Sequence, residues 1–254
     1  MKHEKRERQE RILAALSSTS NLRVAELAHK LNVSTETIRR DFDELTRAGL
    51  LNRTYGGAVR ALSTEASSAS EQHSLYLEAR QRIAQATVAQ VADARILLLG
   101  SGSTAVHIAQ QIAARLKDIM VVTHSFGVAT ALGGNSSIKV MMIPGLYHAG
   151  EASTIGGHAI VFLQSLYADY VILGANGLTE DGPSDAAPEI AAVNMAMLGR
   201  AAKCILAADQ SKFNLVFATR FAGWPQVGTL VTDAPPPGEL RRTLEANRVR
   251  LVVA

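Results

Sequence analysis

The chain has 254 residues with a formal net charge of +3, 47% hydrophobic residues, 19% charged residues and one cysteine. No uninterrupted apolar run approaches the roughly 20 residues that a membrane-spanning helix requires, so the composition excludes a membrane span. The charged N-terminus lacks the apolar segment of a secretory signal, and we expect a cytoplasmic protein. Cys204 lies in an apolar run without a partner cysteine, which favours a buried side chain with no redox chemistry.

The positive charge is concentrated at the N-terminus. Residues 1–60 contain 12 Lys and Arg against 8 Asp and Glu, whereas the remaining residues contain 14 against 15. This asymmetry is typical of a nucleic-acid-binding head joined to a neutral body, although a solvated charged face also produces it. The stretch at 61–70 is small, polar and without periodicity, so we place a linker there, between a first domain at 1–60 and a second at 71–254.

Three short helices are expected in the first domain. A first helix around Ile12 ends near Ser17, and a second repeats apolar residues at helical spacing from Val24 to Leu31. Ser34 then provides an N-cap for a third helix that runs to about 48. The order of helix, tight turn and capped helix predicts a helix-turn-helix unit.

The start of the third helix carries candidate DNA contacts. Ile38, Phe42 and Leu45 form its buried side, so hydroxyl and guanidinium groups face outward near its N-terminus, where they suit base edges and phosphates. The run LLNRTYGGAVR alternates and turns at Gly56 and Gly57, which predicts a two-stranded wing. The expected DNA-binding residues are Ser34, Thr35, Thr37, Arg39, Arg40, Arg53, Tyr55, Gly56 and Gly57.

An alternative for this segment is a small helical bundle in which Arg39 or Arg40 pairs with Asp43 or Glu44 one turn further on. The short turn, the capped helix and the glycine-containing wing occur in the order that DNA reading requires. This order favours the winged helix-turn-helix.

The second domain alternates apolar strands with helices. A long helix is expected over 71–91, followed by the runs RILLLG, IMVVT, IKVMMI, DYVILG and KCILAAD, with LVT and VRLVV near the end. Continuous apolar runs separated by helices predict an α/β domain with a mostly parallel sheet covered on both faces. In such sheets ligands bind at the carboxyl ends of the strands.

Small and polar residues follow four of the predicted strands. The sequence GSGST suits backbone contacts to an anion, but it lacks the third glycine of a dinucleotide fingerprint and the lysine of a nucleotide-triphosphate loop, so no cofactor is expected. Each loop alone is equally compatible with a tight turn, and Asp209 with Lys212 forms either a ligand-facing pair or a salt bridge. The candidate effector-binding residues at these ends are Gly100, Ser101, Gly102, Ser103, Thr104, Thr123, His124, Ser125, Gly174, Asn176, Gly177, Asp209 and Lys212.

The histidines give no sign of a metal site. His107, His148 and His158 are scattered without the spacing of metal ligands, and we expect each to be a surface or capped residue.

The segments VSTETIRRDFDEL and GLLNRTYGGA resemble the helix-turn-helix signature and wing of the DeoR family of bacterial transcription regulators. GSGST, VTHS, VILGANGL, ADQSKF and TDAPPP resemble the second domain of that family, and VTDAPPP is similar to its glycerol-3-phosphate repressor branch. The resemblance implies a second domain of the ribose-phosphate isomerase and coenzyme A transferase type and adds Glu189 to the effector-binding residues. It also implies a repressor of a sugar or polyol operon, operator DNA as partner, a phosphorylated sugar-like effector and a homo-oligomer, dimer or tetramer.

Two departures from the family pattern concern the effector. Gly100 stands where family members often have an acidic residue, and Val193 stands where a lysine usually follows Glu189 by one helical turn. A missing lysine removes a positive charge for a phosphate group.

The alternative function is a sugar-phosphate isomerase-like enzyme with an accessory DNA-binding domain. Such an enzyme needs a positioned general base, for which Asp209, Glu189 and Lys212 are the candidates. No nucleophile, base and orienting group form a recognisable set, which favours a regulator without enzymatic activity.

Overall fold

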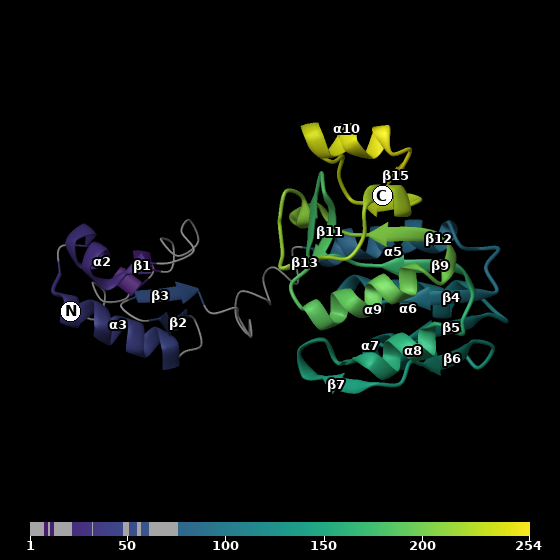
Figure 1. The fold of residues 1–254 in the computed structure, drawn as a ribbon, viewed down its shortest axis with the longest axis horizontal. Helices are drawn as coiled ribbons and strands as arrows, with labels where there is room; N and C mark the ends of the chain where they lie inside the picture. Colours follow the sequence, from purple (N-terminus) through teal and green to yellow (C-terminus); the bar gives the residue numbers. More distant parts are fainter. Residues whose placement is uncertain are drawn as a thin grey trace. The chain divides into compact units, whose positions relative to one another are not determined.

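The computed structural model describes residues 8–9, 11–12, 22–31, 33–47, 51–54, 57–60 and 76–254, and Figure 1 shows their fold. The chain divides into two compact units, Met1–His73 and Ser74–Ala254. Each unit has its own hydrophobic core. The linker predicted at 61–70 lies outside the described residues.

The first unit has the predicted helix-turn-helix with its two-stranded wing. Helix α2 (Val24–Lys30) precedes α3 (Thr35–Arg47), and the wing strands β2 (Leu51–Thr54) and β3 (Gly57–Arg60) pair antiparallel. A short strand β1 (Leu22–Arg23), which the sequence pattern did not indicate, adds to β3 and gives the order β1–β3–β2. The core of this unit contains Ile12, Leu27, Ala28, Ile38, Phe42 and Leu45.

The buried side predicted for the third helix is therefore confirmed. Ile38 and Phe42 are fully buried, and Leu45 is 4% exposed. Their spacing places them on one face of α3, so the opposite face is left for other contacts.

The second unit is built on a seven-stranded parallel sheet with the order β15–β14–β12–β9–β4–β5–β6. All seven predicted strands are present, and every pairing is parallel. They are β4 (Ile96–Leu99), β5 (Met120–Thr123), β6 (Lys139–Met142), β9 (Ala168–Leu173), β12 (Ala201–Ala207), β14 (Thr229–Thr232) and β15 (Arg250–Val253).

Helices cover both faces of this sheet, as predicted (Figure 1). One face packs against α5 (Leu77–Ala89), α6 (Ser103–Arg115) and α7 (Phe126–Leu132). The other face packs against α8 (Gly157–Leu163), α9 (Pro188–Leu198) and α10 (Gly238–Ala246). The helix predicted over 71–91 is α5, which ends at Ala89; residues 71–75 lie outside the described residues.

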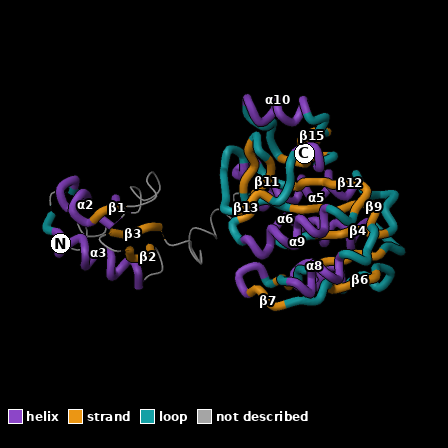
Figure 2. The backbone as a smooth tube through the Cα atoms, viewed as in Figure 1, coloured by secondary structure: helices purple, strands orange, loops and turns teal. Residues whose placement is uncertain are grey.

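Several short elements lie near the main sheet (Figure 2). The sequence pattern did not indicate them. Strands β7 (Leu146–His148) and β8 (Ser153–Ile155) form a hairpin around the 3-10 turn η1 (Ala149–Glu151). Strands β10 (Gly177–Thr179), β11 (Gly182–Asp185) and β13 (Thr219–Arg220) form a second, small sheet. The 3-10 turns η2 (Gln210–Lys212) and η3 (Trp224–Gln226) follow β12 and β13.

Two glycines and a tryptophan pack closely in and around the small sheet. A Cβ atom at Gly177 would lie 2.1 Å from the backbone oxygen of Leu215, and one at Gly182, where φ is +129°, would lie 2.3 Å from that of Ala222. The indole Nε1 of Trp224 donates a hydrogen bond to the Thr179 carbonyl at 2.8 Å. Within the described ranges, no helix is both long enough and apolar enough to cross a membrane.

Candidate functional site

The N-terminus of α3 presents polar groups at the surface. The Ser34 hydroxyl accepts a hydrogen bond from the Thr37 amide at 3.1 Å and lies 2.8 Å from the Thr37 hydroxyl, so the predicted N-cap is confirmed. Thr35, Arg39 and Arg40 are exposed. The amide groups of the first turn and the positive end of the helix dipole add to this surface and favour an anion there.

The two arginines of this surface form loose ion pairs with Glu36. The Arg39 Nη1–Glu36 Oε2 distance is 3.9 Å and the Arg40 Nε–Glu36 Oε1 distance is 3.6 Å, and more than half of each of the three side chains is exposed. Exposed pairs of this length contribute little to stability, so a phosphate or a base edge can replace the carboxylate. The side chain of Asp43, the other partner considered from the sequence, lies outside the described residues.

The opposite side of α3 anchors the N-terminal segment. Asp41 is 1% exposed, and it accepts hydrogen bonds from Arg8 Nε at 2.6 Å and Arg8 Nη2 at 3.2 Å. Gln9 donates from Nε2 to Asp41 at 3.3 Å and to Glu44 at 3.0 Å. Asp41 thus has a structural role in joining α3 to residues before the helix-turn-helix, which the sequence did not indicate.

The strand register fixes the positions of Arg53 and Gly57 in the wing. Arg53 of β2 is the register partner of Ala58, and Gly57 of β3 pairs with both Thr54 and Arg23. The predicted contacts Tyr55 and Gly56 lie outside the described residues.

In the second unit, most of the predicted effector residues lie at one edge of the parallel sheet. Strands β5, β4, β9 and β12 are neighbours, and because they are parallel their carboxyl ends meet at the same edge. The residues that directly follow them are 124, 100, 174 and 208. Glu189 is instead an exposed residue in the first turn of α9, and Gly177 is buried in the small sheet.

The first loop is shaped by its glycines. Gly102 has a φ of +100° and caps α6, with open space around its Cβ position, so Ser103 begins the helix at the surface. Gly100 lies against α9, since a Cβ there would be 3.1 Å from Leu173 Cδ2 and 3.6 Å from Asn194 Oδ1.

The position at which the family pattern usually has a lysine lies in the core of this protein. Val193 is fully buried in the core, so its side chain does not face the loop. Asn194, the next residue of the same turn, is the polar residue beside Gly100, and its Oδ1 has no hydrogen-bond partner among the described residues.

The loop after β5 is fully buried. The Thr123 hydroxyl accepts from the Ser125 amide at 3.1 Å, and Ser125 caps α7. His124 Nδ1 lies 3.0 Å from the Thr154 carbonyl oxygen, to which it donates, while Nε2 has no hydrogen-bond partner in the described part of the chain. Burial lowers the pKa of His124 to about 4, and the hydrogen bond to Thr154 offsets this in part, so the ring is neutral near pH 7.

The loops after β9 and β12 are held by hydrogen bonds and an ion pair within the second unit. Asn176 Oδ1 accepts from the Ala186 amide at 3.2 Å, which ties the end of β9 to the residues after β11. Asp209 is 1% exposed; its carboxylate accepts from the Ser211 amide at 3.0 Å and from the Ser211 hydroxyl, and its Oδ2 lies 3.9 Å from Arg80 Nε. Of the two alternatives for Asp209, the structure gives an ion pair, but with Arg80 of α5 rather than with Lys212.

A polar group that the sequence analysis missed lies beside these loops. His148 and Ser153 belong to the β7–β8 hairpin, Glu151 to η1 and Asp185 to the end of β11. Burial raises the pKa of Glu151, and the nearby charge of Asp185 raises it further while His148 lowers it. Burial also raises the pKa of Asp185, against hydrogen bonds from the Ala187 and Ala186 amides and the charge of His148. No short-range sequence pattern connects Asp185 with the other three residues, because it follows Ser153 by 32 positions.

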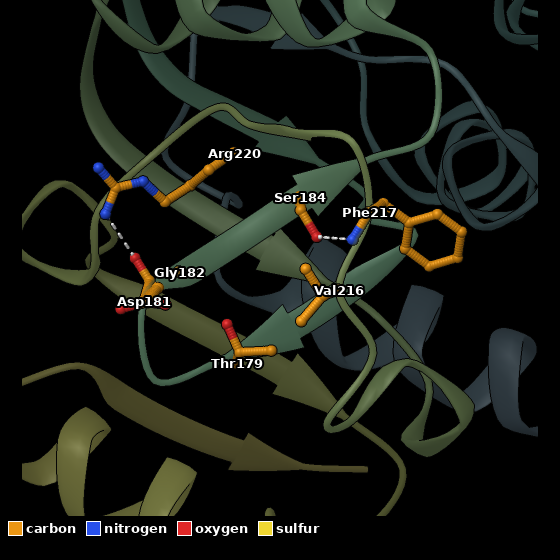
Figure 3. A pocket seen from close by; sticks show the side chains of 7 residues that line it. All are labelled: Thr179, Asp181, Gly182, Ser184, Val216, Phe217 and Arg220. Carbon is orange, nitrogen blue, oxygen red and sulfur yellow. Dashed lines mark hydrogen bonds between the residues drawn. The ribbon is translucent and has the colours of Figure 1, made fainter.

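A pocket of about 290 Å³ opens at the small sheet rather than at the predicted residues (Figure 3). Two of its polar groups are already engaged: the Ser184 hydroxyl accepts from the Phe217 amide at 3.1 Å, and Arg220 Nη1 donates to the Asp181 carbonyl at 3.0 Å. Its lining residues are Thr179, Asp181, Gly182, Ser184, Val216, Phe217 and Arg220. In the described ranges, no group of three or more His, Cys, Asp and Glu side chains is arranged to hold a metal ion.

A winged helix-turn-helix unit with exposed arginines and an α/β unit with polar strand-end loops define a DNA-binding regulator with a sensor domain. The DeoR-like helix-turn-helix domain model matches residues 8–64, and the DeoR C terminal sensor domain model matches residues 76–234, more than half of the chain. The chain belongs to the DeoR family.

Relatives match along nearly the whole chain. The HTH-type transcriptional repressor CsqR of Escherichia coli is 28% identical over 97% of this chain and 94% of that protein. The HTH-type transcriptional regulator GlpR of Haloferax volcanii is 29% identical over 97% and 96%. The glycerol-3-phosphate regulon repressor of Escherichia coli is 25% identical over 89% and 90%. Ribose 5-phosphate isomerase A from Methanocaldococcus jannaschii matches with a TM-score of 0.41 and 16% identity over 54% and 55%, which is too low for an argument about function.

Proposed function

We propose that the protein is a sequence-specific transcription repressor of a sugar or polyol operon, which leaves its operator when a small phosphorylated sugar-like effector binds the second unit. The observation that carries this proposal is the exposed start of α3, where Thr35, Arg39 and Arg40 surround a capped helix N-terminus. Helix N-termini of this kind enter the major groove in helix-turn-helix proteins. Binding to operator DNA requires the compartment that holds the DNA, so the protein acts in the cytoplasm.

The proposal that the second unit binds an effector is supported by the loops at the carboxyl ends of the parallel strands. The α6 N-terminus after Gly102 offers amide groups for a phosphate, and Lys212 and the strand-end loops surround the same edge. The relatives named as a glycerol-3-phosphate regulon repressor and a putative aga operon transcriptional repressor support a carbohydrate-related effector. An L-fucose operon activator is also among the relatives, so the sign of regulation needs a direct measurement.

The coupling follows from linkage. An effector that binds one arrangement of a homo-oligomer better than another shifts the population, and the spacing of two DNA-binding heads then fits or misses symmetric half-sites. A tenfold loss of DNA affinity requires about 1.4 kcal/mol of coupling free energy.

We also propose that the protein has no isomerase activity. The three candidate bases do not form a catalytic set, because Glu189 is exposed on α9 and the Asp209 carboxylate is buried against Ser211 and Arg80. Incubation with sugar phosphates, followed by NMR, should reveal no turnover.

The DNA-binding half is tested with the Arg40→Ala variant. Operator fragments selected from random-sequence DNA by the wild-type protein are titrated with each protein at a fixed salt concentration. If Arg40 makes a bidentate base contact, its loss weakens binding by about 1–3 kcal/mol. Arg115→Ala, an exposed arginine at the end of α6, is the charge-matched control and should bind like wild type. Wild-type affinity of Arg40→Ala would contradict the recognition-helix assignment.

The wing is tested by salt dependence. Arg53→Ala should weaken binding to all DNA sequences and make the slope of log affinity against log salt shallower by about one, because one phosphate contact is lost.

A further inference from the structure

One stretch of the second unit is almost free of charged residues. Residues 119–150 contain a single Lys, Arg, Asp or Glu, which is Lys139, whereas a stretch of this length would contain about six at the chain's average of 19%. Strand β5 of this stretch is buried, but β6 is the last strand of the sheet, and α7 and β7 lie at the same end of the unit (Figure 1). Charged residues are depleted in the cores of protein interfaces, whereas a free surface normally carries them.

The β7–β8 hairpin exposes large apolar side chains. Leu146 is 69% exposed and Tyr147 is 63% exposed. Successive side chains of a strand point to opposite faces, so both faces of β7 are accessible in the described part of the chain. Leu146 lies opposite Ile155 of β8, and Tyr147 lies opposite Thr154. The hairpin therefore projects from the unit with apolar groups in water.

Helix α7 continues the surface of the hairpin. The rings of Phe126, the first residue of α7, and Tyr147 form an edge-to-face pair, with centroids 5.5 Å apart and an interplanar angle of 74°. Phe126 is 45% exposed, so the pair stays accessible. The Phe126 amide donates to the Ala152 carbonyl at 2.9 Å, and the Thr154 amide donates to the His124 carbonyl at 2.8 Å. These hydrogen bonds hold the hairpin against the start of α7, so the two elements form one surface.

This surface, which we call the neutral face, consists of Phe126, Leu146 and Tyr147 with the uncharged residues around them. Aromatic side chains have about 150–250 Å² of surface each, so the exposed fractions of the three residues leave roughly 400 Å² of apolar surface in water. Patches of this size mark interaction sites. A standard interface needs about 800 Å² per partner, a little more than half of it apolar. The three side chains would supply most of that apolar area.

The low charge of the neutral face favours a second copy of this chain as its partner. In a twofold interface a surface meets itself, so charges on it face charges of the same sign, and an uncharged apolar surface avoids this repulsion. A nucleic acid would gain little from this face, because phosphates bind through positive charges. Lys139 is at the start of β6, and the hairpin follows the other end of that strand.

We propose that two copies of this chain pair through the neutral face, with Phe126 and Tyr147 at the centre of the interface. The inference deepens the proposed function and rests on it, because symmetric half-sites require two DNA-binding heads held together. Ser125 caps α7 and forms a β-bridge with Ser153 of β8, so the loop after β5 contacts both elements of the interface. A rearrangement of that loop would change how the two copies meet.

The test measures the mass of the full chain by size-exclusion chromatography with light scattering over a range of concentrations. Wild type should have the mass of at least two chains. The Leu146→Glu/Tyr147→Glu double variant should have half the wild-type mass, with a dissociation constant raised about 100-fold or more, because each copy would bury two carboxylates without partners. Tyr147→Ala, which adds no charge, should raise the dissociation constant about tenfold or more.

The control is the Tyr167→Glu/Val216→Glu double variant. Both replaced residues are 78% exposed and lie outside residues 119–150, so this variant adds the same charges elsewhere and should keep the wild-type mass. Circular dichroism should give the wild-type spectrum for every variant, since all the replaced side chains are exposed. A wild-type protein with the mass of one chain overturns the proposal. Wild-type mass of the Leu146→Glu/Tyr147→Glu variant, or equal dissociation of the control, also overturns it.

Gel shift with the selected operator separates this outcome from that of the proposed function. If the wild-type protein binds its operator while the hairpin variants keep the wild-type mass, the interface assignment fails and the DNA-binding function stands. If the wild-type protein binds no operator, the proposed function fails, and the light-scattering result still decides whether the neutral face joins two copies.

Discussion

At the scale of single residues, buried polar side chains have roles that the apolar pattern of the sequence does not reveal. Asp41 and His124 are both almost fully buried, yet neither belongs to an apolar pattern, and they serve opposite purposes. Asp41 is charged and satisfied by Arg8, whereas His124 is neutral with one nitrogen unsatisfied. Burial of a charge is tolerated only with a partner, so the first is a structural anchor and the second is costly to protonate.

Replacement of Asp41 by Ala should destabilise the first unit. The substitution removes the acceptor of the Arg8 hydrogen bonds and leaves that guanidinium, which is 21% exposed, without its carboxylate, at a cost of about 2–3 kcal/mol. Thermal unfolding followed by circular dichroism measures the change. Glu36→Ala, which removes only exposed pairs, is the control and should cost less than about 1 kcal/mol. Equal effects of the two substitutions would show that the Arg8 contact is absent in solution.

Protonation of His124 should destabilise the second unit in acid. Its folded pKa of about 4 lies below the unfolded value of 6.5, so between these values the unfolded chain binds a proton that the folded chain does not. The free energy of unfolding therefore falls as the pH decreases from 6.5 to 4, by about 3 kcal/mol from this residue.

Denaturant titrations of wild type and His124→Asn across this range isolate the effect. The raised pKa values of Glu151 and Asp185 act with the opposite sign, but they are common to both proteins and cancel in the comparison. The difference in unfolding free energy between the two proteins should shrink as the pH falls. A difference that stays constant with pH would exclude a buried neutral His124.

At the scale of elements, apolar runs and segments with a turn signature were predictable, and the short strands that lack both were not. The seven strands of the main sheet were found from the sequence as apolar runs. Burial on both faces demands such runs in the inner strands, such as β4 and β5. The three-residue strands β7, β8 and β10 owe their conformation to contacts made by distant residues. Local propensity cannot report such contacts, which is why these strands escaped the sequence analysis.

The glycines of the strand-end loops also show that local sequence does not report contacts with distant residues. Gly174 and Gly177 were both assigned to effector binding, but their surroundings differ: a Cβ at Gly174 would meet the nearest atoms at 3.9 Å, while one at Gly177 would clash with Leu215 at 2.1 Å. Gly177 therefore has a packing role that its sequence context did not reveal.

Replacement of each glycine by Ala separates these roles. Gly177→Ala should destabilise the second unit by about 2 kcal/mol, because the backbone of Leu215 must move. Gly174→Ala should change stability by less than about 0.5 kcal/mol. Melting temperatures of the two variants provide the comparison, and a Gly177→Ala protein as stable as wild type would contradict the packing around β10.

At the scale of the whole molecule, two compact units separate the two proposed tasks. We propose the boundary at 61–70, so a fragment of residues 71–254 should fold alone, bind the effector with the affinity of the full chain and have no affinity for the operator. In the full chain a saturating effector should weaken operator binding at least tenfold, equivalent to about 1.4 kcal/mol. Isothermal titration measures effector affinity, and gel shift measures operator affinity. A fragment that fails to fold would place the boundary elsewhere.

The position of the single tryptophan beside the small sheet makes its fluorescence a probe of that sheet. Trp224 is 2% exposed, and its indole donates to the carbonyl of Thr179 in β10. Tryptophan emission, when excited selectively over tyrosine, therefore comes from a buried position in the sensor unit, without any contribution from the DNA-reading unit. Fluorescence spectroscopy can follow rearrangement of the small sheet without an attached dye, even while the same sample is titrated with operator.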